Sequence, residues 1–168
     1  VRATRTEIDI KLVQAGQAAY ADAPAGKRVT DSVVAAGADI IFGMGDGSTF
    51  GMIQAVENAK APAGSEMVWF IDVIGDKTSV DTKGVLLTSV VWDYRPVFRD
   101  ALEQMRDGSY GTEVLYLGLE ENGIGLLEND SIPSHVWDAV EKAREEIRAG
   151  VIDVPVIDRK SDLEALLR

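Results

Sequence analysis

The order of apolar and polar residues along this chain predicts alternating strands and helices. Residues 38–42 and 67–71 are short apolar runs, which are typical of buried parallel strands. Other segments carry apolar residues at intervals of three or four, the spacing of a helix with one buried face. The strands expected from this pattern are residues 8–14, 38–43, 67–72, 86–91 and 114–119.

Four helices are expected between and after these strands. Asp22 and Pro24 are the residue types of a helix start, because proline fits the first turn, where its missing N–H costs little. Gly37 and Gly108 are typical of helix ends, and Pro133 opens the last helix. Phe50, Ile53 and Val56 of the second helix are expected to face inward. The other helices are recognised by apolar residues at helical spacing: Val29, Val33 and Val34; Phe98, Ala101, Leu102 and Met105; and Val136, Val140, Ala143 and Ile147.

Strands that alternate with helices imply parallel strands joined by helical crossovers. The predicted fold is therefore α/β, a mainly parallel sheet flanked by helices on both faces. Ligands of such sheets bind beyond the C-terminal ends of the strands. The segments at those ends are residues 14–22, 43–48, 72–76, 92–94 and 120–125.

Length and composition fit one compact domain. The chain has 168 residues, of which 46% are apolar and 27% charged. A formal net charge of −11 argues against a nucleic-acid binder, which needs basic surface for phosphate contacts. The absence of cysteine leaves no disulfide framework, no thiolate metal site and no thiol nucleophile. No apolar stretch reaches the roughly 18 residues that a membrane span needs.

A glycine-rich loop, Gly-Met-Gly-Asp-Gly-Ser at residues 43–48, connects a predicted strand to a predicted helix. Its glycines permit close backbone approach, and a helix N-terminus favours an anion or a polar group. No lysine follows as in a Walker motif, and Ser48 stands where a dinucleotide fingerprint has its third glycine. Two interpretations stay open, a tight strand-to-helix turn and a loop that cradles a ligand.

Polar and aromatic side chains follow three of the predicted strands. The Asp72 carboxylate can accept two hydrogen bonds from adjacent hydroxyl groups, as on a ribose; the alternatives are a helix cap and a solvated carboxylate. The rings of Trp92 and Tyr94 can stack on a flat ligand, although core packing also accounts for Trp92. Tyr20 can stack in the same way or be an ordinary exposed tyrosine. Asp93 is expected to cap a helix.

Catalytic and metal chemistry have little support in the sequence. His135 is the only histidine, and its surface-type neighbours predict a solvated side chain. One histidine without cysteine leaves no His/Cys zinc site and argues against a Ser-His-Asp triad. With 28 acidic residues, chance proximity is easy, so no carboxylate pair is inferred. We therefore expect no enzyme activity, no metal and no cofactor.

Short segments in a fixed order carry a further signal. Gly-Ala-Asp-Ile-Ile-Phe at 37–42, the glycine loop and Gly-Met-Ile-Gln-Ala-Val at 51–56 come first, followed by Asp72. Leu-Thr-Ser-Val-Val at 87–91, Asp-Gly-Ser-Tyr at 107–110 and the glycines of 118–126 come next. In this order they resemble the basic membrane lipoprotein family, with its G-V-I-Q-A-A, G-V-D, L-T-S-V-V, D-G-T-F and G-L-x-x-x-G-V-G-L segments. Residues 20–24 and 147–155 are similar to the family's S-F-x-D-P and I-x-x-G-x-I-x-V-P.

The resemblance spans nearly the whole chain and implies a two-lobed, periplasmic-binding-protein-like receptor of a transport system. Residues 1–168 correspond to the C-terminal, type I ligand-binding lobe, and residues 151–168 form its tail. The N-terminal lobe of the family is expected to be missing from this sequence. The surface that meets that lobe is then expected to expose apolar side chains.

Ligand-binding roles follow by position from the same resemblance. Tyr20 falls where a phenylalanine stacks on the base, Gly45 where a glycine approaches the sugar, and Asp72 where an aspartate binds the ribose hydroxyls. Trp92 stands where nucleoside-binding members have a lysine, and an indole cannot replace an ammonium. Asp46 is a second departure, from the family's A-G-G-T-G loop. The ligand is therefore expected to be a nucleoside or a similar small polar ring compound.

The function that the resemblance implies is that of the substrate-binding protein of an ABC transporter. Its partners would be a small-molecule ligand, the N-terminal lobe and the transporter permease, with no nucleic acid. It would be extracytoplasmic, as a lipoprotein or a periplasmic protein, and exposed apolar surface favours a homodimer. Two alternatives stay open: the ligand-sensing domain of a transcription regulator, and a nucleotide-binding α/β enzyme.

Overall fold

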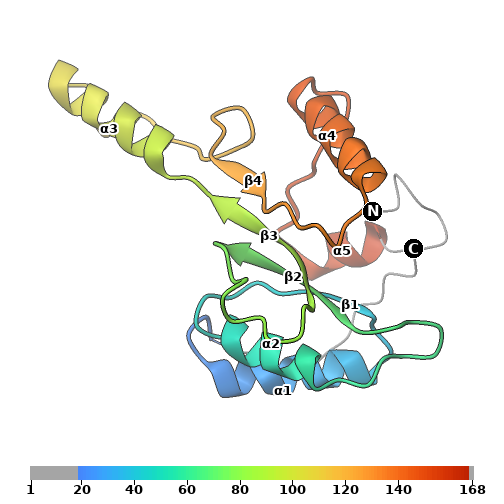
Figure 1. Ribbon diagram of the computed structural model, residues 1–168. Coiled ribbons are helices and arrows are strands. Elements are labelled where there is room, and N and C mark those ends of the chain that lie inside the picture. The colour runs from blue at the N-terminus through green and yellow to red at the C-terminus, as the bar shows by residue number, and fades with distance from the viewer. Residues whose placement is uncertain (1–18, 167–168) are drawn as a thin grey trace.

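The computed structural model describes residues 19–166, and its centre is a four-stranded sheet in the order β1-β2-β3-β4. Strands β1 (Ile40–Phe42), β2 (Trp69–Ile74) and β3 (Leu86–Trp92) are parallel. Strand β4 (Ile124–Leu126) runs antiparallel to β3 at the edge (Figure 1). The expected mainly parallel sheet is confirmed at the three central segments. The strand expected at residues 8–14 lies outside the described residues.

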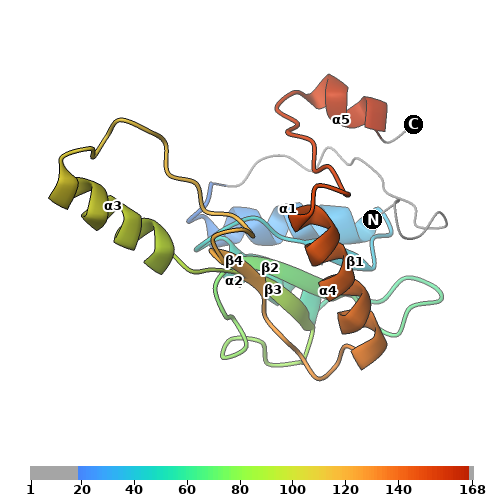
Figure 2. The same cartoon turned by 90° about the horizontal axis from the view of Figure 1, so that it is seen from above.

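Helices cover both faces of this sheet. Helices α1 (Ala23–Ala35) and α2 (Thr49–Glu57) lie together beneath one face, and α4 (Ser134–Arg148) lies against the other face beside β4 (Figures 1 and 2). Helix α3 (Arg95–Asp107) projects away from the sheet after β3. A short helix, α5 (Lys160–Leu166), ends the described chain within the expected tail.

The start of α1 follows the expected helix-start signal. The Asp22 carboxylate accepts a hydrogen bond from the Ala25 amide at 2.9 Å, and Pro24 lies in the first turn. The cap satisfies an amide that has no partner inside the helix. Two glycines then allow α1 to approach α2. A Cβ on Gly51 would overlap the carbonyl oxygen of Ala23, and a Cβ on Gly26 would overlap the Ser48 carbonyl.

The core lies between α2 and the sheet face that α2 covers. It combines apolar residues of the strands with the inner side of α2; its buried members are Ile41, Met52, Ile53, Val56, Val68, Phe70, Val85 and Leu86. The prediction for Ile53 and Val56 is therefore confirmed, but the prediction for Phe50 was wrong, because its side chain is 51% exposed. Phe50 lies four residues before Gln54, on the outer side of the same helix.

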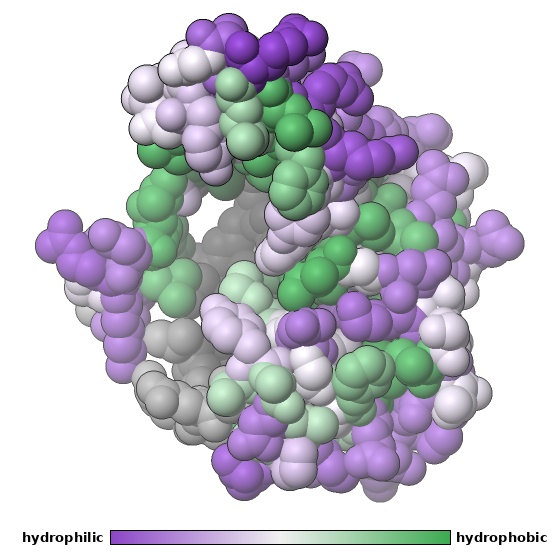
Figure 3. Space-filling view, turned by 90° about the vertical axis from the view of Figure 1, so that its left-hand side faces the viewer, coloured by the Kyte–Doolittle hydropathy of each residue, from purple (hydrophilic) through white to green (hydrophobic). Residues whose placement is uncertain are grey.

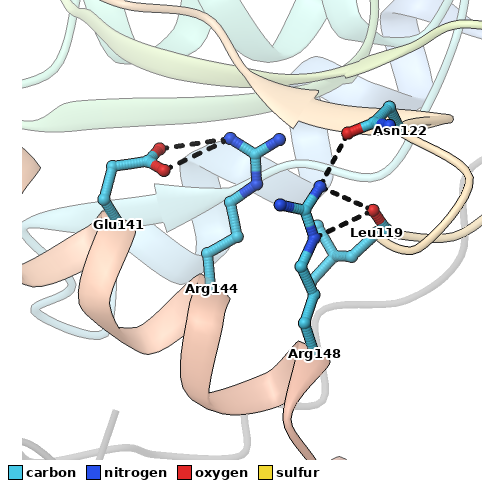
Figure 4. A network of polar contacts seen from close by, with 5 residues as sticks. All are labelled: Leu119, Asn122, Glu141, Arg144 and Arg148. Carbon is cyan, nitrogen blue, oxygen red and sulfur yellow. Dashed lines mark hydrogen bonds and ion pairs between the residues drawn. The ribbon is translucent and has the colours of Figure 1, made fainter.

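The strand expected at residues 114–119 does not form, and β4 takes the position beside β3 instead. The Leu119 carbonyl accepts hydrogen bonds from the Arg148 guanidinium of α4 at 2.8 and 3.1 Å, and Arg148 also binds Asn122 at 2.7 Å (Figure 4). Asn122 has a positive φ of 54°, which turns the chain before β4. Side-chain hydrogen bonds in a turn here replace a strand ladder, a competition that periodicity alone does not reveal.

Helix α3 exposes its apolar stripe. Phe98, Leu102 and Met105 recur at helical spacing as expected, but all three are exposed and α3 has no buried residue. Figure 3 views the molecule from the side on which α3 projects, and apolar surface is visible there between strongly polar regions. Whether this stripe is the surface that meets a second lobe stays a prediction.

The close approach of α1 and α2 predicts a specific glycine requirement. Gly51→Ala should lower the free energy of unfolding by about 1–3 kcal/mol, because the new methyl group overlaps the Ala23 carbonyl. Gly125→Ala is the matched control, since nothing lies within 4 Å of its Cβ position. Urea titrations should place the control within about 0.5 kcal/mol of the wild type. Equal stability of the two variants would contradict the packing described.

Candidate functional site

The candidate site is formed by the loops that follow β1 and β2. The Gly43 amide donates to the Ile71 carbonyl at 2.9 Å, so the glycine loop 43–48 leaves the sheet beside the end of β2. The segment before α1 joins the same loop: the Tyr20 carbonyl accepts hydrogen bonds from the amides of Asp46 at 3.2 Å and Ser48 at 2.7 Å. Tyr20, Gly45 and Asp46 therefore lie near the end of β2, although they are distant from that strand in sequence. This is the edge where ligands of such sheets bind.

The glycines of this loop have packing reasons of their own. A Cβ on Gly43 would meet the Phe70 ring at 2.5 Å, and a Cβ on Gly47 would meet the Ala21 backbone at 3.1 Å. Gly45 is buried, and a side chain there would collide with the Ser48 hydroxyl. The interpretation as a tight strand-to-helix turn is thus sufficient to explain the glycines. A ligand-cradling role stays a prediction.

Asp72 is the most unusual group at this edge, because its side chain is fully buried. One carboxylate oxygen, Oδ1, accepts a hydrogen bond from the Thr49 hydroxyl at 2.9 Å. The other, Oδ2, is buried without a hydrogen-bond partner among the described residues. Buried polar atoms are normally satisfied, so an unpaired carboxylate oxygen is an exception that calls for an explanation.

The pKa of Asp72 is raised above its ordinary value of 3.8, mainly because burial removes water from the carboxylate. The nearby Asp46 carboxylate raises it further. The Val73 amide, the Thr49 hydroxyl and the Lys77 ammonium act in the opposite direction without cancelling the effect of burial. Burial thus makes the Asp72 carboxylate resist ionisation.

Lys77 belongs to this site, although the sequence analysis treated its segment only as a polar loop. Its ammonium lies 3.8 Å from Asp72 Oδ2, and its side chain is only 14% exposed. The signal that could have found it is its position, a lysine five residues beyond an aspartate at a strand end. A long lysine in a loop is usually solvated, so that signal is weak without the fold.

The loop that carries Lys77 is fixed on both sides of the lysine. The Ser89 hydroxyl of β3 donates to the Gly75 carbonyl at 2.7 Å. The Asp76 carboxylate accepts from the Thr78 amide and hydroxyl at 2.8 and 2.7 Å, which lowers the pKa of Asp76. Ile74, at the start of the turn, has a φ of 78°, a conformation that is strained for a β-branched residue. Strain of this kind persists only where surrounding contacts enforce it.

Trp92 is not brought together with Asp72. Asp72 is the register partner of Ser89, and side chains alternate along a strand, so Trp92 extends from the opposite face of β3. Its register partner is Ile124 of β4, and its ring lies edge-on to Tyr94 at 6.0 Å. Trp92 nevertheless ends its strand at the same edge of the sheet, with 37% of the residue exposed.

Asp93 and His135 have the structural roles expected of them. The Asp93 carboxylate accepts a hydrogen bond from the Arg95 amide at 3.0 Å and pairs with its guanidinium, which lowers the pKa of Asp93 to about 2. It therefore stabilises the start of α3, as a capping residue does. His135 is exposed in the first turn of α4.

Two further observations limit the chemistry of the described residues. Within residues 19–166, no cluster of three histidine, cysteine, aspartate or glutamate side chains could hold a metal ion. No helix of that part is long and apolar enough to cross a membrane.

A mainly apolar cavity of about 400 Å³ lies under α4, lined by Val90, Leu119, Ile124, Leu126, Trp137, Val140, Ala143 and Ile147 among others. Val90 lies on the sheet face opposite Asp72, so this cavity is separate from the candidate site.

The model of the PnrA-like family of ABC transporter substrate-binding proteins matches residues 1–158. The chain belongs to this family. Among curated proteins, a nucleoside-binding protein of an ABC transporter, BmpA from Lactococcus lactis subsp. cremoris (strain MG1363), is 29% identical over 168 residues. The match covers 92% of this chain and 46% of that protein. The chain thus spans about half the length of this PnrA-like relative.

Solved structures show the same fold at low identity. An ABC transporter solute-binding protein from Conexibacter woesei DSM 14684 aligns with a TM-score of 0.64 and 21% identity, covering 92% of this chain and 49% of that one. One from Aeropyrum pernix K1 aligns with a TM-score of 0.68 and 16% identity, covering 89% and 49%. A transcriptional activator of the comK gene from Bacillus halodurans aligns with a TM-score of 0.61 and 17% identity, covering 76% and 43%. The expected α/β fold is confirmed.

The raised pKa of Asp72 predicts how stability depends on pH. Folding disfavours the ionised carboxylate, so the penalty is present above the folded-state pKa and disappears as the pH falls through it toward 3.8. Asp72→Asn keeps an acceptor for Thr49 and removes this penalty. Its advantage in free energy of unfolding over the wild type should therefore be largest at neutral pH and shrink on acidification. Urea titrations of both proteins from neutral to acidic pH measure this difference in free energy of unfolding. A difference that does not change with pH would refute the prediction.

Proposed function

We propose that this chain provides a ligand-binding lobe of an ABC transporter substrate-binding protein and binds a nucleoside or a similar small polar ring compound. The observation that supports the proposal most is the buried, unpaired Oδ2 of Asp72 at the C-terminal edge of the sheet. A ligand hydroxyl group is the partner that this oxygen lacks. Family membership supplies the transport role, and the relative named for nucleoside binding supplies the ligand class.

The neighbouring groups have complementary roles in this proposal. Tyr20, which is 71% exposed, offers a ring face for the base or its equivalent. The loop at Gly45 brings backbone close to the ligand, and Asp46 offers a second, exposed acceptor. Trp92 contributes by edge packing from the end of β3. The opposite wall of the site is a second lobe, since ligand sites of this kind bury most of the ligand surface.

A binding role explains these groups better than catalysis does. Asp72 is held by the Thr49 hydroxyl and lies 3.8 Å from the Lys77 ammonium, so its polar neighbours can orient a ligand. Family membership favours a receptor over an enzyme. As a transport receptor it would face the outside of the cytoplasmic membrane, as a lipoprotein or a periplasmic protein, and dock on the permease.

A ligand-sensing domain of a transcription regulator is the second candidate, because the fold is shared with the comK activator structure. That likeness concerns the fold alone. The two candidates differ in the sequence encoded immediately upstream, which would be a signal peptide with a lipobox for the receptor and a helix-turn-helix for the regulator. Sequencing the whole gene therefore separates them.

Substitution of Asp72 tests the ligand site. A hydrogen bond to a charged group is worth about 1.5–3 kcal/mol. Asp72→Ala should therefore weaken nucleoside binding by roughly ten- to a hundredfold. Calorimetry on the complete gene product measures this, with Asp138→Ala on the exposed side of α4 as the control. Asp72→Asn keeps the shape of the side chain and serves as a second variant in case Asp72→Ala does not fold. Unchanged affinity in a folded Asp72→Ala protein would remove Asp72 from the site and the nucleoside proposal with it.

Trp92 tests the departure from the lysine of nucleoside receptors. Trp92→Ala should weaken binding of the native ligand, because the indole edge contact is lost. Trp92→Lys should not preserve the native ligand preference, since an ammonium cannot replace that contact. Competition calorimetry with a panel of purine and pyrimidine nucleosides measures both. Wild-type affinity in both variants would place Trp92 outside the site.

Self-association of these 168 residues is a separate proposal, based on the exposed stripe of α3. Exposed apolar patches favour association, so scattering should show a dimer in which Leu102→Glu shifts the population toward monomer. Glu103→Lys, on the polar side of the same helix, should leave the dimer intact. A monodisperse monomer that binds ligand at full affinity would contradict both the dimer and the need for a second lobe.

A further inference from the structure

Asp72 and Lys77 lie close together without a direct hydrogen bond. Asp72 Oδ2 and Lys77 Nζ are 3.8 Å apart, whereas a direct ammonium–carboxylate hydrogen bond spans about 2.7–2.9 Å. The two groups therefore attract each other without bonding directly. Oδ2 is left without a donor, and the ammonium keeps its hydrogens for another acceptor.

A single hydroxyl group could bond to both of these atoms at once. An oxygen at about 2.8 Å from both Oδ2 and Nζ closes a triangle whose third side is the observed 3.8 Å. A hydroxyl group both donates and accepts, so it can donate to the carboxylate and accept from the ammonium at the same time. A methyl group or a carbonyl cannot satisfy both partners.

Contacts of the loop on both sides of Lys77 keep this residue next to Asp72. Ser89 binds the Gly75 carbonyl, Asp76 binds Thr78, and the strained Ile74 turns the chain so that Lys77 lies over the carboxylate. The lysine is the partly exposed member, at 14%, while Asp72 has no exposed surface. Lys77 is therefore the member of the pair that has surface accessible to a ligand.

We propose that Lys77 is a specificity-determining residue of this site, which forms with Asp72 a donor–acceptor pair that takes one hydroxyl group of an uncharged ligand. The inference rests on the proposed function and assigns its polar recognition to Lys77. An uncharged hydroxyl satisfies both members of the pair, whereas a phosphate group would bring its negative charge against the Asp72 carboxylate. The ligand class is therefore a nucleoside-like compound with a free sugar hydroxyl rather than a nucleotide.

Calorimetry with adenosine, 2′-deoxyadenosine and 3′-deoxyadenosine tests the pair in the complete gene product. The wild type should prefer adenosine over at least one deoxy analogue by roughly tenfold, the worth of one such hydrogen bond. In Lys77→Met most of this preference should disappear, because the variant and the analogue remove the same interaction. Lys77→Arg should retain part of the preference, and Lys142→Met on α4 should retain all of it.

The outcomes distinguish a failure of the proposed function from a failure of the role proposed for Lys77. If the wild type binds none of the three compounds, the proposed function fails, and Lys77 loses its role with it. If the wild type binds adenosine but shows no preference among the three, or if Lys77→Met weakens all three equally or none, the role of Lys77 alone is overturned. A purely structural lysine would give the equal weakening. Lys77→Gln is the second neutral variant should methionine unfold the loop, as thermal unfolding would reveal.

Discussion

The site depends on one buried hydrogen bond, from the Thr49 hydroxyl to the Asp72 carboxylate. Thr49 begins α2 and Asp72 lies in β2, so this bond fixes the helix start against the C-terminal half of the strand. Burying a carboxylate is unfavourable unless it is well hydrogen-bonded. Here only one of its oxygens is satisfied, and the pKa is raised accordingly. The fold therefore maintains an unsatisfied acceptor at the edge of the sheet where ligands bind.

The packing of α1 against α2 allows that arrangement. Gly26 and Gly51 remove the side chains that would separate the two helices, and the Tyr20 carbonyl bonds to the amides of Asp46 and Ser48. The glycine loop is thereby held from two directions while its polar side chain, Asp46, stays exposed. A rigid backbone with a few directed polar groups lowers the ordering cost of binding. The same contacts that stabilise this half of the molecule thus also prepare the site.

The other half of the molecule is organised differently. Helix α4 is attached to the turn before β4 through Arg148, leaving an apolar cavity beneath it, and α3 makes no buried contact. Parallel sheets are usually covered on both faces, and within residues 19–166 nothing buries the apolar stripe of α3. Since the chain spans about half the length of its curated relative, a surface of this kind suits contact with another lobe or chain. The proposed polar recognition and the proposed apolar association thus involve different parts of the chain.

The sequence by itself determined the three parallel strands and the start of α1, because each depends on local pattern: apolar runs and the capping Asp22. It also singled out Asp72 as a candidate, a carboxylate near the end of a strand. It also identified the segments that carry the family pattern. Only the tertiary structure decided that Phe50 faces outward, that residues 114–119 give way to a turn bound by Arg148, and that Trp92 lies on the face opposite Asp72. It alone placed Lys77 against Asp72. These outcomes depend on contacts between residues distant in sequence, on strand register and on competing side-chain hydrogen bonds, none of which is visible in the local alternation of polar and apolar residues.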